Sequence, residues 1–165
     1  MRLLPRITVL EETRLVGMRR KMSFARDETA ALWRAFMPRR GEIVNPASSD
    51  WYSVQVYGSD FDFGPQSVFE KWALQPVHDF AQVPGGMEPF LLKGGRYAVF
   101  AYKGRGGDPA VFKYIFTEWL PASGFSLDDR PHFEVLGKAY KNQDPASEEE
   151  IWIPIRQGKG IPGEH

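Results

Sequence analysis

The residues best suited to chemistry lie in one stretch near the end of the chain, residues 132–155. Its first part predicts a strand in which Glu134 points away from Phe133, because successive side chains of a strand alternate between its faces. Its second part predicts a strand with isoleucines on one face and Glu150 and Trp152 on the other. If the isoleucines face the core, the opposite face carries carboxylates beside a large ring. That combination suits a lipophilic cation.

Four aromatic residues are further candidates for contact with a ligand. Tyr57, Trp72 and Trp152 lie on strand faces that the alternation assigns away from the core. Tyr97 opens another strand and could supply a hydroxyl. Rings near a carboxylate favour a bound cation by about 0.5–2 kcal/mol each when water is excluded. Packing against another part of the chain accounts for the three strand residues equally well. The predicted ligand-binding set is Glu134, Tyr57, Trp72, Trp152 and Tyr97.

The composition narrows the class of partner. Lys plus Arg and Asp plus Glu each number 21, so the chain has no net charge with which to attract nucleic acid or an anionic membrane. The absence of cysteine excludes disulfides and thiolate chemistry, and the 3 histidines are too scattered to predict a metal site. We therefore expect no cofactor and no metal. No apolar run resembles a signal peptide or a membrane span, so we expect a cytoplasmic protein.

Two segments carry apolar residues at helical spacing. Residues 28–37 follow a plausible N-cap at Asp27 and end at Pro38, and residues 110–120 end at a second proline. Gly17 lies in the first predicted strand and is a possible bulge. Besides the hairpin described above, strands are predicted within residues 7–24, 51–58, 69–77 and 91–107.

The order of these elements repeats along the chain. Strand, helix, strand and strand occur at about residues 13–78 and again at about 95–156. Such a match can arise by chance, because helices that end in proline are common. The helix ends nevertheless agree at a single offset: Trp33, Phe36, Met37 and Pro38 correspond to Phe116, Trp119, Leu120 and Pro121.

The closing strands of the two units also match. Gln55 occupies in the first unit the place that Glu134 holds in the second, and Glu70 and Trp72 correspond to Glu150 and Trp152. We therefore predict an α+β fold of duplicated βαββ units that form an antiparallel sheet, with both helices packed on one side and a ligand cleft between the repeats. The predicted organisation is a single domain over residues 1–165, with repeat one at about 7–82, repeat two at about 88–156 and a tail at 157–165.

The second half contains four pieces that are fairly specific in combination: GGRYAVFAYKG, TEWLPASG, RPHFEVLG and EEEIWIPI. They resemble the GyrI-like small-molecule-binding family. This family includes the effector-binding domains attached to AraC-type and MerR-type multidrug regulators, as well as stand-alone gyrase-inhibitory proteins. The resemblance covers nearly the whole chain and is strongest over residues 88–155. It implies a duplicated βαββ fold.

The resemblance also implies a cleft between the repeats that receives hydrophobic, often cationic compounds. Its central acceptor is the glutamate of the phenylalanine–glutamate pair, which here is Glu134. Without the resemblance, a surface glutamate on a solvated sheet face is the better interpretation of this residue. The sequence departs from the family at Leu136, where members often carry tyrosine. Both predicted helices belong to the repeats, which leaves no room for a DNA-binding helix-turn-helix.

We therefore expect non-catalytic binding of hydrophobic, cationic small molecules, in a sensor or a sequestering protein. The alternative is a hydrolase of strained, cyclopropanoid electrophiles, because some GyrI-like proteins have this activity; Glu134 would then be the general base. Binding and base catalysis both require a glutamate among rings, so the sequence does not separate them. Interaction with another protein, including gyrase, is a third possibility. Expected partners are lipophilic or cationic small molecules, with a homodimer or a regulator protein as possible assemblies and no direct contact with nucleic acid or membrane.

Overall fold

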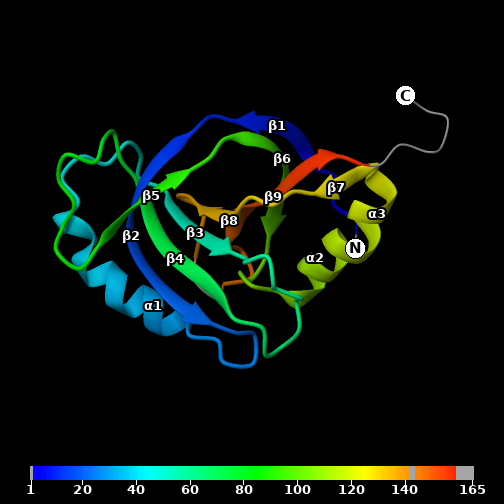
Figure 1. Ribbon diagram of the computed structural model, residues 1–165, viewed down its shortest axis with the longest axis horizontal. Helices are drawn as coiled ribbons and strands as arrows, with labels where there is room; N and C mark the ends of the chain where they lie inside the picture. The colour runs from blue at the N-terminus through cyan, green and yellow to red at the C-terminus, as the bar shows by residue number, and fades with distance from the viewer. Residues whose placement is uncertain (1, 142–143, 159–165) are drawn as a thin grey trace.

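The computed structural model describes residues 2–141 and 144–158. At its centre lies one antiparallel sheet of 9 strands, with two helical segments on one side of it (Figure 1). The predicted α+β class is confirmed. The strands are β1 (Arg6–Leu10), β2 (Thr13–Met22), β3 (Trp51–Val56), β4 (Phe69–Pro76), β5 (Glu88–Leu92), β6 (Gly95–Lys103), β7 (Phe125–Leu127), β8 (His132–Leu136) and β9 (Glu148–Gln157).

The first helical segment agrees closely with its prediction. It consists of α1 (Thr29–Phe36) followed by the 3₁₀-helix η1 (Met37–Glu42). The Asp27 carboxylate accepts a hydrogen bond from the backbone N–H of Thr29 at 2.9 Å, which satisfies a free donor at the start of the helix. Pro38 lies at the start of η1, so the α-helical part ends just before the proline.

The second helical segment is longer than predicted. It consists of α2 (Pro109–Tyr114), the π-helical turn η2 (Ile115–Trp119) and α3 (Leu120–Ser123). The prediction that Pro121 ends the helix is wrong. Pro121 falls in the first turn of α3, where its missing N–H removes no essential hydrogen bond, and the segment ends instead at Gly124, whose φ is 81°. Among the described residues, no helix is long and apolar enough to cross a membrane.

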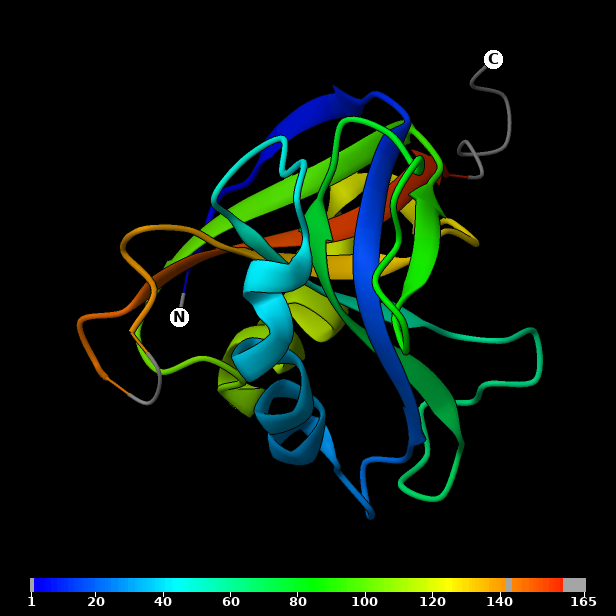
Figure 2. The same ribbon diagram turned by 90° about the vertical axis from the view of Figure 1, so that its left-hand side faces the viewer.

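The sheet has a symmetric strand order, β1-β6-β9-β8-β3-β4-β2-β5, with β7 paired to β9. β3 and β8 form its centre, and on either side of them lie corresponding strands of the two halves of the chain. The outermost strands are exchanged, because β1 pairs with β6 and β5 pairs with β2. Each half therefore completes the sheet of the other (Figure 2).

Apolar side chains are buried on both faces of the sheet. On the helix side, α1 packs over β2 and β4, and α2 with η2 packs over β6 and β9. The opposite face is concave and encloses a separate core that contains Leu15, Val54, Trp72, Leu74, Tyr97 and Phe133. Each face of the sheet therefore carries buried apolar side chains.

Two details of the predicted strands need correction. Gly17 is not a bulge, because the pairing of β2 with β4 continues through it without interruption. At the other end of the chain, β9 continues to Gln157, so the predicted tail begins within a strand. Residues 159–165 of that tail lie outside the described residues.

Candidate functional site

Four polar residues lie at the centre of the sheet, on its helix side, and we call them the polar seam. In the pairing of β3 with β8, Gln55 lies opposite His132 and Ser53 lies opposite Glu134, so all four point to the same face. Ser53, Gln55 and His132 are each 6% exposed, and Glu134 is partly buried. Burial of polar side chains in the middle of a sheet costs free energy unless they are paired, and here Gln55 donates a hydrogen bond to Oγ of Ser53 at 3.4 Å.

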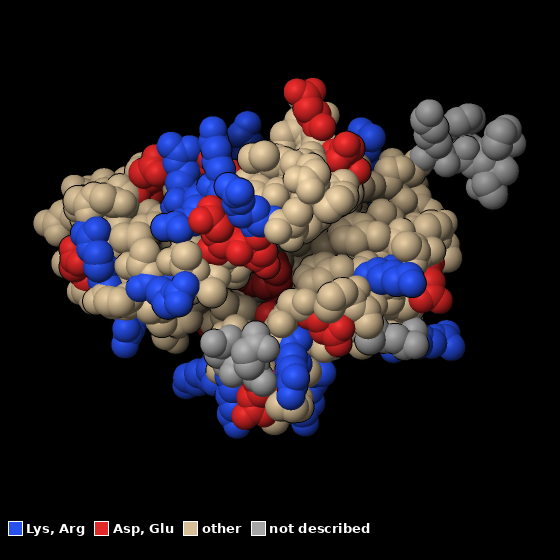
Figure 3. All heavy atoms as spheres, turned by 90° about the horizontal axis from the view of Figure 1, so that it is seen from below, with Lys and Arg blue, Asp and Glu red and all other residues tan. Residues whose placement is uncertain are grey.

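The surface above the polar seam is hollowed between the two halves of the molecule. Figure 3 views the helix side and shows acidic atoms deep in this central hollow. The hollow agrees with the topology, because α1 packs mainly over β2 and β4 and α2 with η2 mainly over β6 and β9. The helical segments reach the central pair β3 and β8 through the ring contacts Phe36–Trp51 and Phe116–His132.

Glu134 supplies the carboxyl group of the polar seam. Burial raises the pKa of its carboxyl group, and the nearby charge of Lys71 and a hydrogen bond from Gln55 lower it in part. Desolvation is the largest of these effects, so the ionised carboxylate is held at a cost in free energy. A cation that reached this carboxylate would relieve that cost.

Glu149 is a second carboxylate on the same face. Glu134 lies opposite Ile151, and Glu149 precedes Ile151 by two residues, so its side chain points to the same side of the sheet. Glu149 is 8% exposed. Burial, followed by the charge of Glu134, raises its pKa to about 7, and the charge of Lys71 acts in the opposite direction.

Lys71 is the cation that faces both carboxylates. It lies on β4 directly opposite Gln55, and its Nζ donates a hydrogen bond to Oγ1 of Thr29 at the start of α1, at 3.1 Å. Its charge lowers the pKa of both Glu134 and Glu149. The hydrogen bond to α1 holds this ammonium group at the α1 side of the central hollow.

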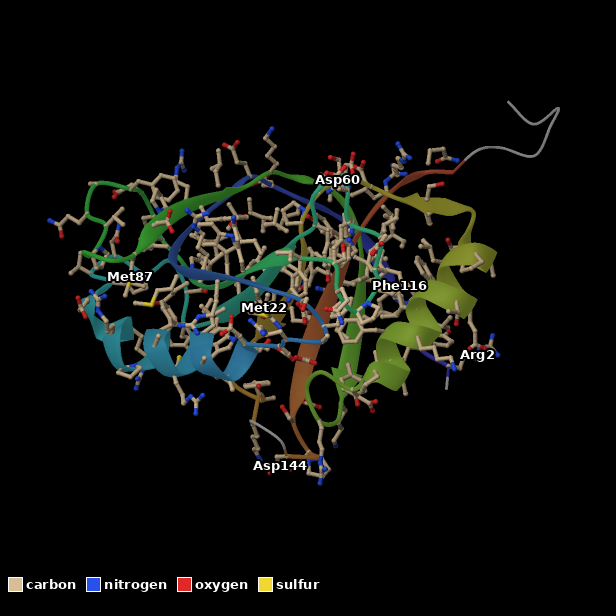
Figure 4. All side chains as sticks on the ribbon, turned by 60° about the horizontal axis from the view of Figure 1, so that its bottom comes forward. Arg2, Met22, Asp60, Met87, Phe116 and Asp144 are labelled. Atoms are coloured by element: carbon tan, nitrogen blue, oxygen red, sulfur yellow. The ribbon has the colours of Figure 1, made fainter. Side chains whose placement is uncertain are left out.

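Aromatic rings form one wall of the central hollow. Tyr57 follows β3 and stacks on Phe61 with ring centroids 4.4 Å apart, and it meets His132 edge-on at 4.9 Å. Phe116 in η2 contacts the same His132 ring at 6.0 Å and Phe63 at 6.1 Å. Figure 4 shows Phe116 projecting from the second helical segment toward the middle of the molecule. The β3–β4 loop and the second helix therefore meet across the polar seam.

The titratable groups of this wall are held neutral. Burial lowers the pKa of His132 to about 4, so its imidazole carries no charge at neutral pH. Burial and the charge of Glu134 raise the pKa of Tyr57, which therefore keeps its hydroxyl proton. In the described part of the chain, the imidazole of His132 has no hydrogen-bond partner. The aromatic wall itself therefore carries no charge.

The structure separates the predicted site residues into two groups. Glu134 and Tyr57 lie together at the central hollow. Trp72, Trp152 and Tyr97 lie on the concave face: Trp152 is opposite Phe133, and Trp72 is opposite Val54. The expectation that Glu134 shares a face with Trp152 is therefore wrong. The binding roles assigned to these five residues remain predictions.

The physical reason is that the sheet buries both of its faces. The isoleucines of β9 do face a core, but Glu134 is on their side and Trp152 is on the other. Trp72 is 6% exposed and Tyr97 is fully buried, with its hydroxyl donating to the carbonyl of Pro131 at 2.9 Å. A sheet with a single buried face would have placed the tryptophans in solvent, as the sequence argument assumed.

The rings of Trp72 and Trp152 also contact charged side chains of the same chain. Arg6 lies 5.7 Å from the ring of Trp152 and bonds to Glu150 at 2.9 Å, and the indole N–H of Trp152 donates to the same carboxylate. The other half repeats this arrangement with Arg19, Trp72 and Glu70. We call these two groups the arginine clamps. Internal cations thus already cover the rings.

Several residues of the central hollow were missed by the sequence argument. Glu149 lies within a run of three glutamates, and its spacing from the isoleucines identifies it as the one that shares their face. The phenylalanines of the loop SDFDFGPQS are large rings in a polar stretch, which is an unusual pattern for a surface loop. Phe63 has a φ of 61°, a conformation that bulky residues rarely adopt. Lys71 and His132 gave no signal in the sequence, because their role depends on the pairing of distant strands.

Comparisons with known proteins agree with this fold. A family model described as the GyrI-like small molecule binding domain matches residues 4–156. The transcriptional regulator BrlR of Pseudomonas aeruginosa is 28% identical over 144 residues, which is 86% of this chain and 51% of that regulator. The chain thus spans about half the length of this curated relative.

Solved structures share the fold at low sequence identity. SAV2435 bound to tetraphenylphosphonium has a TM-score of 0.70 and 16% identity, with 100% of this chain and 98% of that chain covered. The C-terminal domain of EcmrR has a TM-score of 0.68 and 16% identity, with 95% and 99% covered. A hydrolase from Listeria innocua has a TM-score of 0.57 and 11% identity, with 93% and 92% covered. Because the family model extends over almost all of the described residues and the fold agrees, the chain belongs to the GyrI-like small-molecule-binding domain family.

Proposed function

We propose that this chain binds hydrophobic cations in the central hollow between the two βαββ repeats, and that Glu134 pairs with the positive charge. The observation that carries the proposal is the balance of charge there. Among the described residues, Lys71 is the cation whose charge acts on both carboxylates, Glu134 and Glu149, and a wall of neutral aromatic rings lies beside them. A monovalent cation supplies the missing positive charge.

The physical basis of this affinity is relief of desolvation. A partly buried carboxylate is costly when ionised, and an arriving cation compensates for the lost hydration. The rings of Tyr57 and Phe116 add apolar contact and a cation–π attraction of about 0.5–2 kcal/mol each in a dry site. Flat rings and a charge select for area and charge rather than for outline, so ligands of different shape would share the site.

The role of such binding is that of a sensor or a sequestering protein. The relative BrlR is a transcriptional regulator of which the match covers 51%, and SAV2435 was solved with tetraphenylphosphonium, a lipophilic cation. Both agree with a module that takes up an amphipathic cation. In a sensor, binding of the cation would be transmitted to a regulator protein that contacts this chain.

The test is the Glu134→Gln variant, which keeps the shape of the side chain and removes its charge. We expect tetraphenylphosphonium to bind the wild-type chain and to lose on the order of 1–3 kcal/mol of binding free energy in the variant, measured by isothermal titration calorimetry. A neutral triphenyl compound of similar area should lose much less. Equal losses for the charged and the neutral compound would contradict a role for the charge.

Glu150→Gln is the matched control. Glu150 lies on the same strand as Glu149 but on the concave face, where its partner is Arg6. We expect this variant to bind tetraphenylphosphonium as the wild type does. If Glu150→Gln weakens binding and Glu134→Gln does not, the ligand lies on the concave face and the proposed site is wrong.

Hydrolysis of a strained electrophile is the second candidate function. The observation that favours it is a pair of neighbouring carboxyl groups in different protonation states, since Glu149 holds a proton near neutral pH more readily than a normal glutamate. Glu134 as general base and Glu149 as general acid would suit addition of water to a cyclopropanoid ring. Incubation with such a compound, followed by mass spectrometry, would reveal the hydrated product. Its absence would leave binding as the function.

A further inference from the structure

Glu149 is a buried acid without a compensating partner. It is 8% exposed, yet within residues 2–141 and 144–158 its carboxylate has neither a hydrogen bond nor an ion pair. Buried carboxylates are normally paired, because an isolated charge is costly in a medium of low polarity. Its remaining exposure is to a cavity at the start of β9, and this limited hydration favours either a protonated side chain or a cation from outside.

The groups around Glu149 come from every neighbouring element. Glu134 on β8 is its diagonal neighbour in the sheet, at a separation of roughly 7–8 Å between such positions. Tyr102 on β6 lies directly opposite it, and Tyr140 in the β8–β9 loop lies close enough to feel its charge. Lys71 on β4 is the cation whose field reaches it.

The cavity that touches Glu149 at the start of β9 has a volume of about 590 Å³. Asp50, Lys103 and Lys138 lie along it, together with Glu148 and Glu150. Its charges are of both signs, so it supplies no consistent field that would hold Glu149 ionised. Burial therefore has the largest effect on the pKa of Glu149, and Glu134 and Lys71 are the charges that modify it.

A hydrogen bond from Gln55 favours the ionised form of Glu134, whereas Glu149 receives none from the described residues. With Glu134 ionised, the charged groups of the described residues give the central hollow two distinct states. With both glutamates ionised, the hollow holds one net negative charge, because Lys71 balances only one carboxylate. With Glu149 protonated, the hollow is neutral. A monovalent cation bound beside an ionised Glu149 also leaves it neutral. Either a proton on Glu149 or a bound monovalent cation therefore neutralises the same excess negative charge.

We propose that Glu149 exchanges a proton for the ligand: it is protonated in the empty hollow and ionises when a monovalent cation binds beside Glu134. This inference rests on the proposed function and adds its regulation by pH. The exchange balances, since the hollow takes up one positive charge and releases one proton to solvent. The raised pKa of Glu149, about 7, agrees with this assignment.

The proposal predicts a specific pH dependence. Cation affinity should rise with pH while Glu149 loses its proton and then level off. With a pKa of about 7, tetraphenylphosphonium should bind about tenfold more weakly at pH 6 than at pH 8. The probe is a permanent cation, so its own charge does not change with pH. His132 does not contribute over this range, because its pKa is about 4.

Calorimetric titrations of the full chain with tetraphenylphosphonium, in buffers of low and high ionisation enthalpy, count the protons directly. We expect the wild type to release roughly half a proton per ligand at pH 7 and nearly a whole proton at pH 6. Glu149→Gln should release none and should bind equally well at pH 6 and pH 8. Glu150→Gln, on the opposite face, should behave as the wild type.

The outcomes separate this inference from the proposed function. Saturable binding without proton release, or without pH dependence, would overturn the proton exchange while the binding function stands. Proton release that persists in Glu149→Gln but disappears in Glu134→Gln would assign the exchange to Glu134 and overturn the role of Glu149. Failure of the wild type to bind at any pH would overturn the proposed function, and this inference with it. Circular dichroism of each variant shows that the fold is retained.

Discussion

At the scale of the residue, the function of each glutamate depends on which face of its strand it occupies. Glu149 and Glu150 are neighbours in sequence and lie on opposite sides of the sheet. Glu149 meets Glu134 at the central hollow, whereas Glu150 belongs to an arginine clamp on the concave face. Two adjacent glutamates thus have different chemistry, because one is buried without a partner and the other is paired with Arg6.

His132 gives a prediction at this scale. Its pKa falls from about 6.5 in the unfolded chain to about 4 in the folded one, because of burial. Between these values the unfolded chain binds more protons, so the contribution of His132 to stability is present above pH 6.5 and is lost as the pH falls toward 4. We expect wild-type stability, relative to His132→Leu, to fall by on the order of 2 kcal/mol between pH 7 and pH 5.

Urea unfolding of the two proteins at both pH values measures this difference. His78→Leu is the control for removal of a histidine, because His78 is exposed. The contribution of Glu149 to stability changes with pH in the opposite direction to that of His132. Because its pKa is raised, the folded state holds a proton on Glu149 between pH 4.5 and about 7, and this stabilisation is lost as the pH rises. A His132→Leu variant with the same pH dependence as the wild type would contradict the assignment.

At the scale of the element, the backbones of β2 and β4 lie so close together at Gly17 that a single added methyl group would disturb their pairing. A Cβ atom at Gly17 of β2 would overlap the carbonyl oxygen of Ala73 on β4. This glycine is required for close approach of two backbones, and its φ lies outside the left-handed region. The sequence signalled an unusual position at Gly17 and suggested a bulge, whereas the structure shows an unbroken ladder with no space for a methyl group.

Gly17→Ala is therefore expected to destabilise the protein by about 2–3 kcal/mol, since β2 or β4 must move to make space. Thermal and urea unfolding measure the change. Gly41→Ala is the matched control, because a Cβ there would meet nothing within 4 Å, and its effect should lie within about 0.5 kcal/mol of wild type. Equal stability of both variants would show that β2 and β4 adjust without cost.

At the scale of the whole molecule, the two halves depend on each other. β1 belongs to the first half and pairs with β6 of the second, and β5 precedes β6 and pairs with β2 of the first. The central contact between β3 and β8 also joins the halves, and it carries the polar seam. The central hollow therefore exists only when both halves are assembled.

Separation of the chain in the turn at residues 84–87 tests this dependence. Each half should fold poorly alone, because it lacks an exchanged edge strand and half of the central pair, but the two halves should associate when they are produced together. Co-purification through a tag on one half, followed by circular dichroism, measures the outcome. Cooperative unfolding of either half as an isolated monomer would contradict this interdependence.

The sequence by itself determined the positions of most strands, the start of each helix, the repeated order of elements and the equivalence of Gln55 with Glu134. The strand registers agree with that equivalence, since Val54 lies opposite Trp72 and Phe133 lies opposite Trp152. These features follow from side chains that are neighbours along the chain, where periodicity gives the direction of each one.

Only the tertiary structure decided which residues meet at the central hollow. The exchange of β1 and β5, the second core on the concave face and the convergence of Glu134, Glu149 and Lys71 depend on pairing between strands far apart in sequence. Alternation along a strand distinguishes its two faces but does not say what covers either of them. For this reason the sequence argument assigned the tryptophans to the wrong face. The curled sheet has an apolar core on each face, and the polar seam lies on the face that the isoleucines of β9 share, opposite the tryptophans.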